Sequence, residues 1–209
     1  MPFMKRFFVV LFAVVLILCN GCGGGSGPVW PPDGDGDGRV PGYALLYPDK
    51  TCRWDMQSFP ILVWIDSPPA SAGGYGPSMV QAAIEGMEMW NGAIDGVPVT
   101  FQLEQVEENT DIRIRWEAMN LGGYTLATEF PDRIRIRKAA LNETLRDPAM
   151  IRLLMAHELG HVLGLDLSNT HGDLMFATVD SDTTSFTDRD SKMINWLYGQ
   201  ENYFPIRSE

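Results

Sequence analysis

Residues 157–165 read His-Glu-Leu-Gly-His-Val-Leu-Gly-Leu, and this stretch decides the fold expected for the chain. The two histidines are four positions apart, so on an α-helix His157 and His161 project from nearly the same face and can bind one metal ion. Glu158 lies about a quarter-turn round that helix, where it can reach a water on the metal without being a ligand itself. The pattern therefore predicts a zinc site on a helix that ends near Gly164.

Both histidines also have a plainer interpretation, as side chains that merely pack in a helix or face solvent. Their context favours the metal site, because the chain has 3 histidines and all of them lie between positions 157 and 171. Chance would rarely gather them in this way. We therefore expect a metal-dependent reaction in which Glu158 takes a proton from water and passes it to the leaving group.

The surrounding sequence predicts a domain that mixes strands and helices. An Asp-Pro pair at residues 147–148 begins the zinc helix, since proline fits a first turn and the preceding acid can cap it. Apolar residues at spacings of three and four predict another helix over residues 77–94, with Trp90 in the core. A capping-box-like start, with Asp190 in place of Glu or Gln, predicts a helix over residues 187–199. Strands are expected over residues 61–65, 97–103, 111–116, 123–130 and 133–137.

Residues 60–199 resemble the matrixin-like (peptidase M10-like) family of the metzincin clan of zinc peptidases. The most specific parts are residues 157–165 and the Gly-Asp-Leu-Met-Phe of residues 172–176, which is similar to the family's Met-turn. The resemblance implies that Met175 forms an apolar floor under the metal. It also implies an α+β zincin fold in a single catalytic domain. This fold has a twisted mixed sheet, two long helices and a small C-terminal subdomain with a helix.

The third zinc ligand is the place where the sequence departs from the family. The family's third histidine falls ten positions after His157, and Leu167 stands there, which cannot bind zinc. His171 is expected to replace it, because seven residues beyond Gly164 can reach up to roughly 23 Å. Asp166 is the alternative third ligand, and a site completed by water, or an inactive one, is also open.

The resemblance further implies one catalytic Zn²⁺, a protein or peptide substrate and a monomeric chain. Structural Ca²⁺ would agree with the family, but the Asp-Gly repeat at residues 33–38 lacks the acid that a calcium loop needs at its twelfth position, where Ala44 stands. Cys52 raises the question of latency, since a thiolate can occupy zinc. Its neighbours lack the family's proenzyme motif, which favours a buried or idle cysteine.

Residues 1–22 have the pattern of a processing signal. Two basic residues, Lys5 and Arg6, precede an uncharged run over residues 7–18 that is too short to span a bilayer comfortably. The segment resembles a bacterial lipoprotein leader with lipidation at Cys22, or alternatively at Cys19, and simple cleavage is the plainer interpretation. We expect export to the bacterial cell envelope, as a membrane-anchored outer-membrane lipoprotein or as a secreted, extracellular protein.

Residues 23–42 are rich in Gly, Pro and Asp, which predicts a flexible linker before a catalytic domain over residues 43–209. The chain has a formal net charge of -11 at pH 7. Such a surface repels phosphate backbones, which excludes nucleic acid as an expected partner.

Together these features predict a zinc-dependent endopeptidase with Glu158 as its general base. One rival is a catalytically silent zinc-binding surface protein, which Leu167 at the third-ligand position motivates. Another is a metal-free, lipid-tethered adhesion or scaffold module. Both rivals leave Glu158 without a role.

Overall fold

The structure is a computed structural model of the 209-residue chain. It describes residues 38–47, 50–91, 99–180 and 184–209, and the backbone of residues 14–17. The helices in these ranges are α1 (Gly76–Glu88), α2 (Pro148–Val162) and α3 (Asp188–Gly199). The strands are β1 (Val14–Ile17), β2 (Tyr43–Leu45), β3 (Cys52–Trp54), β4 (Ile61–Ile65), β5 (Phe101–Leu103), β6 (Ile112–Glu117), β7 (Gly123–Phe130), β8 (Arg133–Asn142), β9 (Leu165–Ser168) and β10 (Phe204–Arg207).

The large sheet has the strand order β1-β7-β8-β6-β4-β5. Strand β10 lies off this path and pairs with both β8 and β3. The pairs β4–β5, β4–β6 and β6–β8 are parallel, whereas β7 and β8 form an antiparallel hairpin. The sheet is therefore mixed, as expected. Alternating burial along β6 and β7 shows that one face of the sheet packs inward, because successive side chains point to opposite faces.

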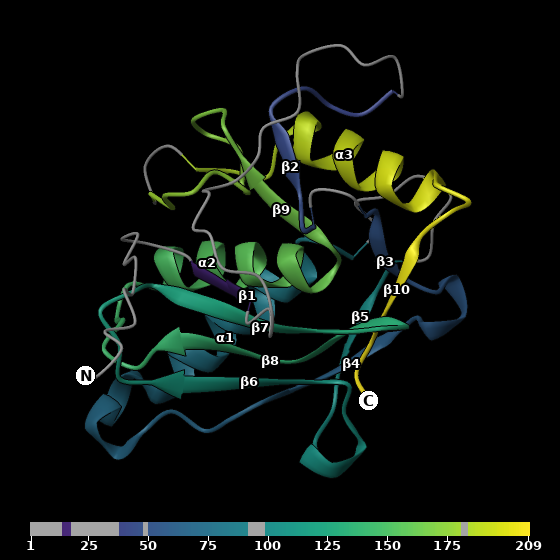
Figure 1. The fold of residues 1–209 in the computed structure, drawn as a ribbon. Helices are drawn as coiled ribbons and strands as arrows, with labels where there is room; N and C mark the ends of the chain where they lie inside the picture. The colour runs from purple at the N-terminus through teal and green to yellow at the C-terminus, as the bar shows by residue number, and fades with distance from the viewer. Residues whose placement is uncertain (1–13, 18–37, 48–49, 92–98, 181–183) are drawn as a thin grey trace, which may run out of the picture.

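Two long helices pack against each other and against the sheet. Helix α1 contacts α2 and β5, and α2 contacts β7 and β8. Gly86 of α1 permits this close approach, because a Cβ there would lie 2.3 Å from the backbone oxygen of Arg152 in α2. Figure 1 shows α2 between the large sheet and the C-terminal part with β9 and α3, to which β2 is added by pairing with β9. The zinc helix of the sequence analysis is thus enclosed on both sides.

A glycine and two side-chain hydrogen bonds fix the C-terminal end of α2. Gly164 has a φ of 103° and its Cβ, if it had one, would lie 2.1 Å from the backbone oxygen of Cys52, so glycine is required where the chain turns into β9. The last carbonyls of a helix lack partners within it. Here Trp54 donates its indole N–H to the Val162 oxygen at 2.7 Å, and Tyr198 donates its hydroxyl to the Leu163 oxygen at 3.0 Å.

The expected α+β fold is confirmed, with differences at the ends of elements. Helix α1 ends at Glu88 and not at residue 94, while β8 continues to Asn142, well beyond the predicted residue 137. Trp90 lies in the core as predicted, and its indole N–H donates to the Ala156 oxygen at 2.7 Å. Strands β2, β3, β9 and β10 were not predicted, since segments of three or four residues give no clear periodicity.

Much of the N-terminal region falls outside the described residues. Cys19, Cys22 and residues 33–37 of the Asp-Gly repeat lie there, and lipidation, the leader and the flexible linker stay predictions. Within the predicted leader, the backbone of β1 pairs in parallel with β7, from Val14 beside Tyr124 to Ile17 beside Ala127. Among the described residues, no helix combines the length and the apolar character needed to cross a membrane.

Candidate metal centre

Helix α2 carries the candidate site and is buried on nearly every side. Asp147 caps it by accepting a hydrogen bond from the Ala149 N–H at 3.0 Å, and Pro148 occupies its first turn, as predicted. From Leu153 to Val162 every residue is buried, because the sheet covers one side and the C-terminal part covers the other. The three polar residues of the motif therefore lie within the protein, each with 0% of its surface exposed.

The imidazoles of His157 and His161 point toward each other through their Nε2 atoms, which lie 3.1 Å apart. Their Nδ1 atoms bond to backbone oxygens, that of His157 to Leu174 at 2.7 Å and that of His161 to Leu165 at 2.9 Å. A carbonyl oxygen only accepts, so each Nδ1 carries the hydrogen and each Nε2 of a neutral ring presents a lone pair. Burial lowers the pKa of His157 to about 4 and that of His161 well below its usual value, which agrees with neutral rings.

Such a pair fits a metal ion. Two lone pairs that face each other repel unless a cation lies between them. Two nitrogens bound to one tetrahedral zinc at about 2.05 Å would lie about 3.3 Å apart, close to the separation of the two Nε2 atoms. The bond from each Nδ1 to a backbone oxygen is also the usual way in which a protein orients a histidine ligand. Both predicted histidine ligands are therefore brought together, with donor atoms suited to zinc.

Glu158 follows His157 in α2, and its two carboxylate oxygens have different surroundings. Its Oε2 accepts a hydrogen bond from the Thr125 hydroxyl at 2.8 Å. Its Oε1 is buried and has no hydrogen-bond partner among the described residues. Burial raises the pKa of Glu158 to about 8, and the hydrogen bond from Thr125 opposes this increase. A buried carboxylate oxygen without a partner is costly, which suggests that it serves the chemistry of the site.

The two candidates for a third ligand are placed differently from the histidine pair. His171 is exposed, and its ring lies edge-on to Phe176 with the centroids 5.3 Å apart. Asp166 in β9 accepts a hydrogen bond from the Leu167 N–H at 2.8 Å, and burial raises its pKa to about 6. In the part of the chain that the structure describes, no group of three or more His, Cys, Asp or Glu side chains is close enough to hold a metal. The structure thus joins His157 and His161 but brings neither candidate to them.

Met175 lies against α2 beside Gly160, and its role as a floor under the metal stays a prediction. It is fully buried, and a Cβ on Gly160 would approach its sulfur to 2.3 Å. The turn that contains it is held by Asp190, whose carboxylate accepts hydrogen bonds from the N–H groups of Leu174 at 3.1 Å and Met175 at 3.2 Å. Since the Leu174 carbonyl also accepts a hydrogen bond from His157, Asp190 supports a candidate metal ligand through one intervening residue.

Asp190 and Thr125 are the site residues that sequence reasoning missed. The sequence predicted for Asp190 only a place in a capping box at the start of α3, and this capping box does form with Thr187. Thr125 gave no signal, because a threonine on an alternating strand is ordinary. Cys52, considered for latency, is buried in β3 and its thiol lies 3.7 Å from the Lys50 oxygen.

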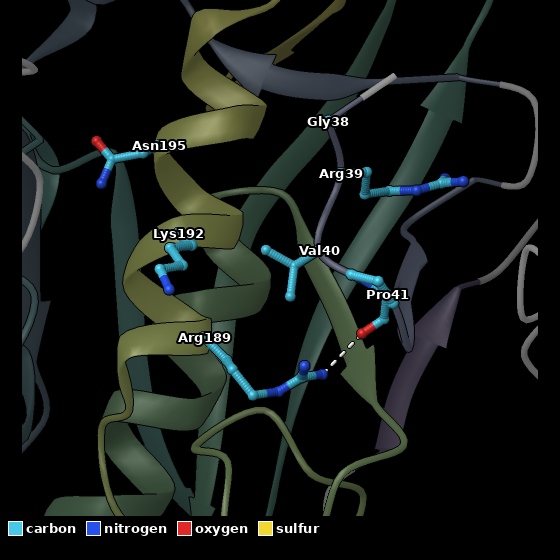
Figure 2. Close-up of a pocket in the computed structure, with 7 residues that line it drawn as sticks. All are labelled: Gly38, Arg39, Val40, Pro41, Arg189, Lys192 and Asn195. Carbon is cyan, nitrogen blue, oxygen red and sulfur yellow. Dashed lines mark hydrogen bonds between the residues drawn. The ribbon is translucent and has the colours of Figure 1, made fainter. Parts of the chain in front are cut away.

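A surface cavity of about 490 Å³ lies elsewhere, between α3 and the segment that leads into β2. Figure 2 shows its lining residues, of which Arg189 donates a hydrogen bond to the Pro41 oxygen, while the Arg39 guanidinium lies 5.8 Å from the ring centroid of Trp196 in α3. The cavity is lined by Gly38, Arg39, Val40, Pro41, Arg189, Lys192 and Asn195. None of these belongs to the metal centre, so this cavity is not the candidate site.

Comparison with known proteins agrees with the geometry. The family described as matrixin, peptidase M10, matches residues 75–199, which run from the start of α1 to the end of α3 and include the complete candidate site. No curated protein matches the sequence.

Proposed function

Because the chain belongs to the matrixin family of zinc metallopeptidases, we propose that it is a zinc-dependent endopeptidase with Glu158 as its general base. One observation carries the proposal. Two neutral histidines present their Nε2 lone pairs to each other at 3.1 Å, beside a buried carboxylate that has an unpartnered oxygen. This arrangement is costly for an ordinary core but suits a hydrolytic metal centre.

In the proposed site zinc is held by His157 and His161, with a third donor from the segment after α2. That donor is His171, with Asp166 as the alternative. Gly172 follows His171 and has a φ of 94°, a backbone conformation available to glycine, so the chain already bends sharply there. The loop must turn inward for the exposed imidazole to reach the pair.

Separate groups of the site have separate roles in the proposed hydrolysis. Zinc, when bound, supplies a Lewis acid that activates water and polarises the substrate carbonyl. The Leu174 and Leu165 oxygens keep the two histidines neutral and oriented. Glu158 takes a proton at Oε1 from the water that attacks the carbonyl carbon. It then gives the proton to the amide nitrogen as the C–N bond breaks, so that a carboxylic acid and an amine leave.

Substrate access is proposed along the edge of β7. An extended peptide can add to an exposed strand edge through backbone hydrogen bonds. In this structure β1 pairs with that edge from Tyr124 to Ala127. Cleavage of the predicted leader would remove β1 and leave the edge to the substrate. Export to the bacterial cell envelope, with lipidation at Cys22 or Cys19, is part of the same proposal.

A second candidate function is a zinc-binding surface protein without turnover. Leu167 at the family's third-ligand position favours it, together with the exposed position of His171. Metal content and hydrolysis, measured on the same samples, separate the two candidates.

The test uses the leaderless chain, residues 23–209, after dialysis against a weak chelator. We expect about one zinc per chain, cleavage of a broad peptide library, and loss of cleavage but not of zinc in Glu158→Gln. Loss of zinc in His171→Ala, but not in Asp166→Ala, would identify the third ligand. Zinc without turnover would support the silent protein, and a wild type without zinc would contradict both functions.

A further inference from the structure

Thr125 contacts the proposed general base from the neighbouring strand. It lies in β7 with 1% of its surface exposed, and its side chain faces α2. Its hydroxyl oxygen lies 2.8 Å from Glu158 Oε2 and 3.0 Å from the backbone oxygen of the same residue. Both distances are within hydrogen-bonding range, so one side chain touches Glu158 at two points.

The hydroxyl has a single proton, so it can donate to only one of these oxygens at a time. As a general base Glu158 must be ionised to take a proton, and in that form its carboxylate oxygen is the stronger acceptor, because charge-assisted hydrogen bonds are roughly twice as strong as neutral ones. Donation to Oε2 therefore fixes the orientation of the carboxylate. It also leaves Oε1 as the oxygen that is available to a water molecule.

Gly123 leaves space beside that other oxygen. It precedes Thr125 by two positions, so a side chain at residue 123 would point to the same face of β7 as Thr125. A Cβ at Gly123 would lie 2.9 Å from Glu158 Oε1 and 2.8 Å from the Ala140 oxygen. Any larger residue would press on Oε1. One strand thus holds one carboxylate oxygen and keeps the space beside the other open.

We infer that Thr125 is a positioning residue for the reaction, which orients Glu158 so that Oε1 faces the attacking water, while Gly123 keeps that side clear. The inference rests on the proposed function, since it assigns a role within the same site. A purely structural role for Thr125 makes the opposite prediction about its substitutions. Valine keeps its shape in the core and loses only the hydroxyl, whereas serine keeps the hydroxyl and leaves a cavity the size of a methyl group.

The experiment compares Thr125→Val, Thr125→Ser and the wild type in zinc content, kcat and KM. Thr128→Val is the matched control, because it makes the same change on the same strand at a half-buried position away from Glu158. We expect all proteins to retain zinc. Thr125→Val should lower kcat about ten- to hundredfold with KM unchanged, the loss expected for one hydrogen bond to a charged group. Thr125→Ser and Thr128→Val should stay within about threefold of the wild type.

Crystal structures of the zinc-free proteins give a second result that does not depend on activity. We expect the Glu158 carboxylate to keep its place in Thr125→Ser and to leave it in Thr125→Val. A Thr125→Val protein with normal kcat, or with the carboxylate unmoved, overturns the inference, as does a Thr125→Ser protein that is equally impaired. If the wild type binds zinc but cleaves no peptide, the proposed function fails, and the crystal structures alone decide whether Thr125 positions Glu158.

Discussion

Replacing Asp190 by asparagine tests how the C-terminal helix supports the metal centre. The carboxylate is fully buried, and its Oδ1 accepts hydrogen bonds from the Tyr43 hydroxyl at 2.6 Å and the Met175 N–H at 3.2 Å. Its Oδ2 accepts from the Leu174 N–H at 3.1 Å, and from the N–H and hydroxyl of Thr187 at 2.8 and 2.6 Å. Asparagine has the same shape as aspartate. The Asp190→Asn substitution therefore replaces one acceptor oxygen by an NH₂ group without opening a cavity.

The amide of asparagine cannot satisfy all these donors in either orientation. With its oxygen at the Oδ1 position, two backbone N–H groups lose their acceptor, those of Leu174 and Thr187. With the oxygen at the Oδ2 position, the Met175 N–H loses its acceptor, while a hydroxyl such as that of Tyr43 can rotate to accept. Each buried N–H without a partner costs about 1–3 kcal/mol, and the remaining bonds lose their charge assistance. We therefore expect Asp190→Asn to lower the free energy of unfolding by about 2–4 kcal/mol.

The same substitution should weaken zinc binding, because Leu174 links Asp190 to His157. Loss of an outer partner of a metal ligand typically lowers affinity about 10- to 100-fold. Urea unfolding of the zinc-free protein and competition with a chelator measure the two effects. Asp188→Asn is the control, since it makes the same change at an exposed position in the first turn of α3. The reasoning is refuted if Asp190→Asn destabilises the protein by less than about 1 kcal/mol, or no more than the control.

Four further predictions follow from the same contacts. Gly164→Ala should destabilise the protein by about 3 kcal/mol or more, because the residue has a positive φ and its new Cβ would meet the Cys52 oxygen; thermal unfolding measures it. Trp54→Phe should cost about 1–2 kcal/mol in urea unfolding, since the last carbonyl of α2 loses its indole donor. A strong chelator should lower the Tm of the wild type but leave that of His157→Ala unchanged, because only a protein that binds zinc is stabilised by it. Leu167→His should raise zinc affinity about tenfold or more in a competition assay, by placing an imidazole at the family's third-ligand position.

The sequence predicted the parts of the site that depend on local geometry. The spacing of His157 and His161 places both imidazoles on one face of any α-helix, whatever surrounds it. The Asp-Pro start and the glycine end of that helix are also local signals, and the structure has both. The strands predicted over residues 111–116 and 123–130 agree closely with β6 and β7.

Contacts between distant segments could not be predicted in this way. Thr125 is 33 positions from Glu158, and Tyr43 is 147 positions from Asp190, so no periodicity connects the members of either pair. The direction of His171 is a similar case. Chain length shows that it can reach the metal, but the side to which it turns depends on how β9 and α3 hold the loop.

The loop after α2 is held at both ends by His157 and His161, the two candidate metal ligands. His161 bonds to Leu165 at the start of β9, and His157 bonds to Leu174 just beyond the loop. The intervening residues 166–173 include the family position 167 and both alternative ligands. Because the pair is oriented by backbone oxygens, it does not need a side chain at residue 167 to keep its geometry. This arrangement explains how leucine can stand at that position while the two-histidine centre persists, since a third donor from elsewhere in the loop would join a pair that is already in place.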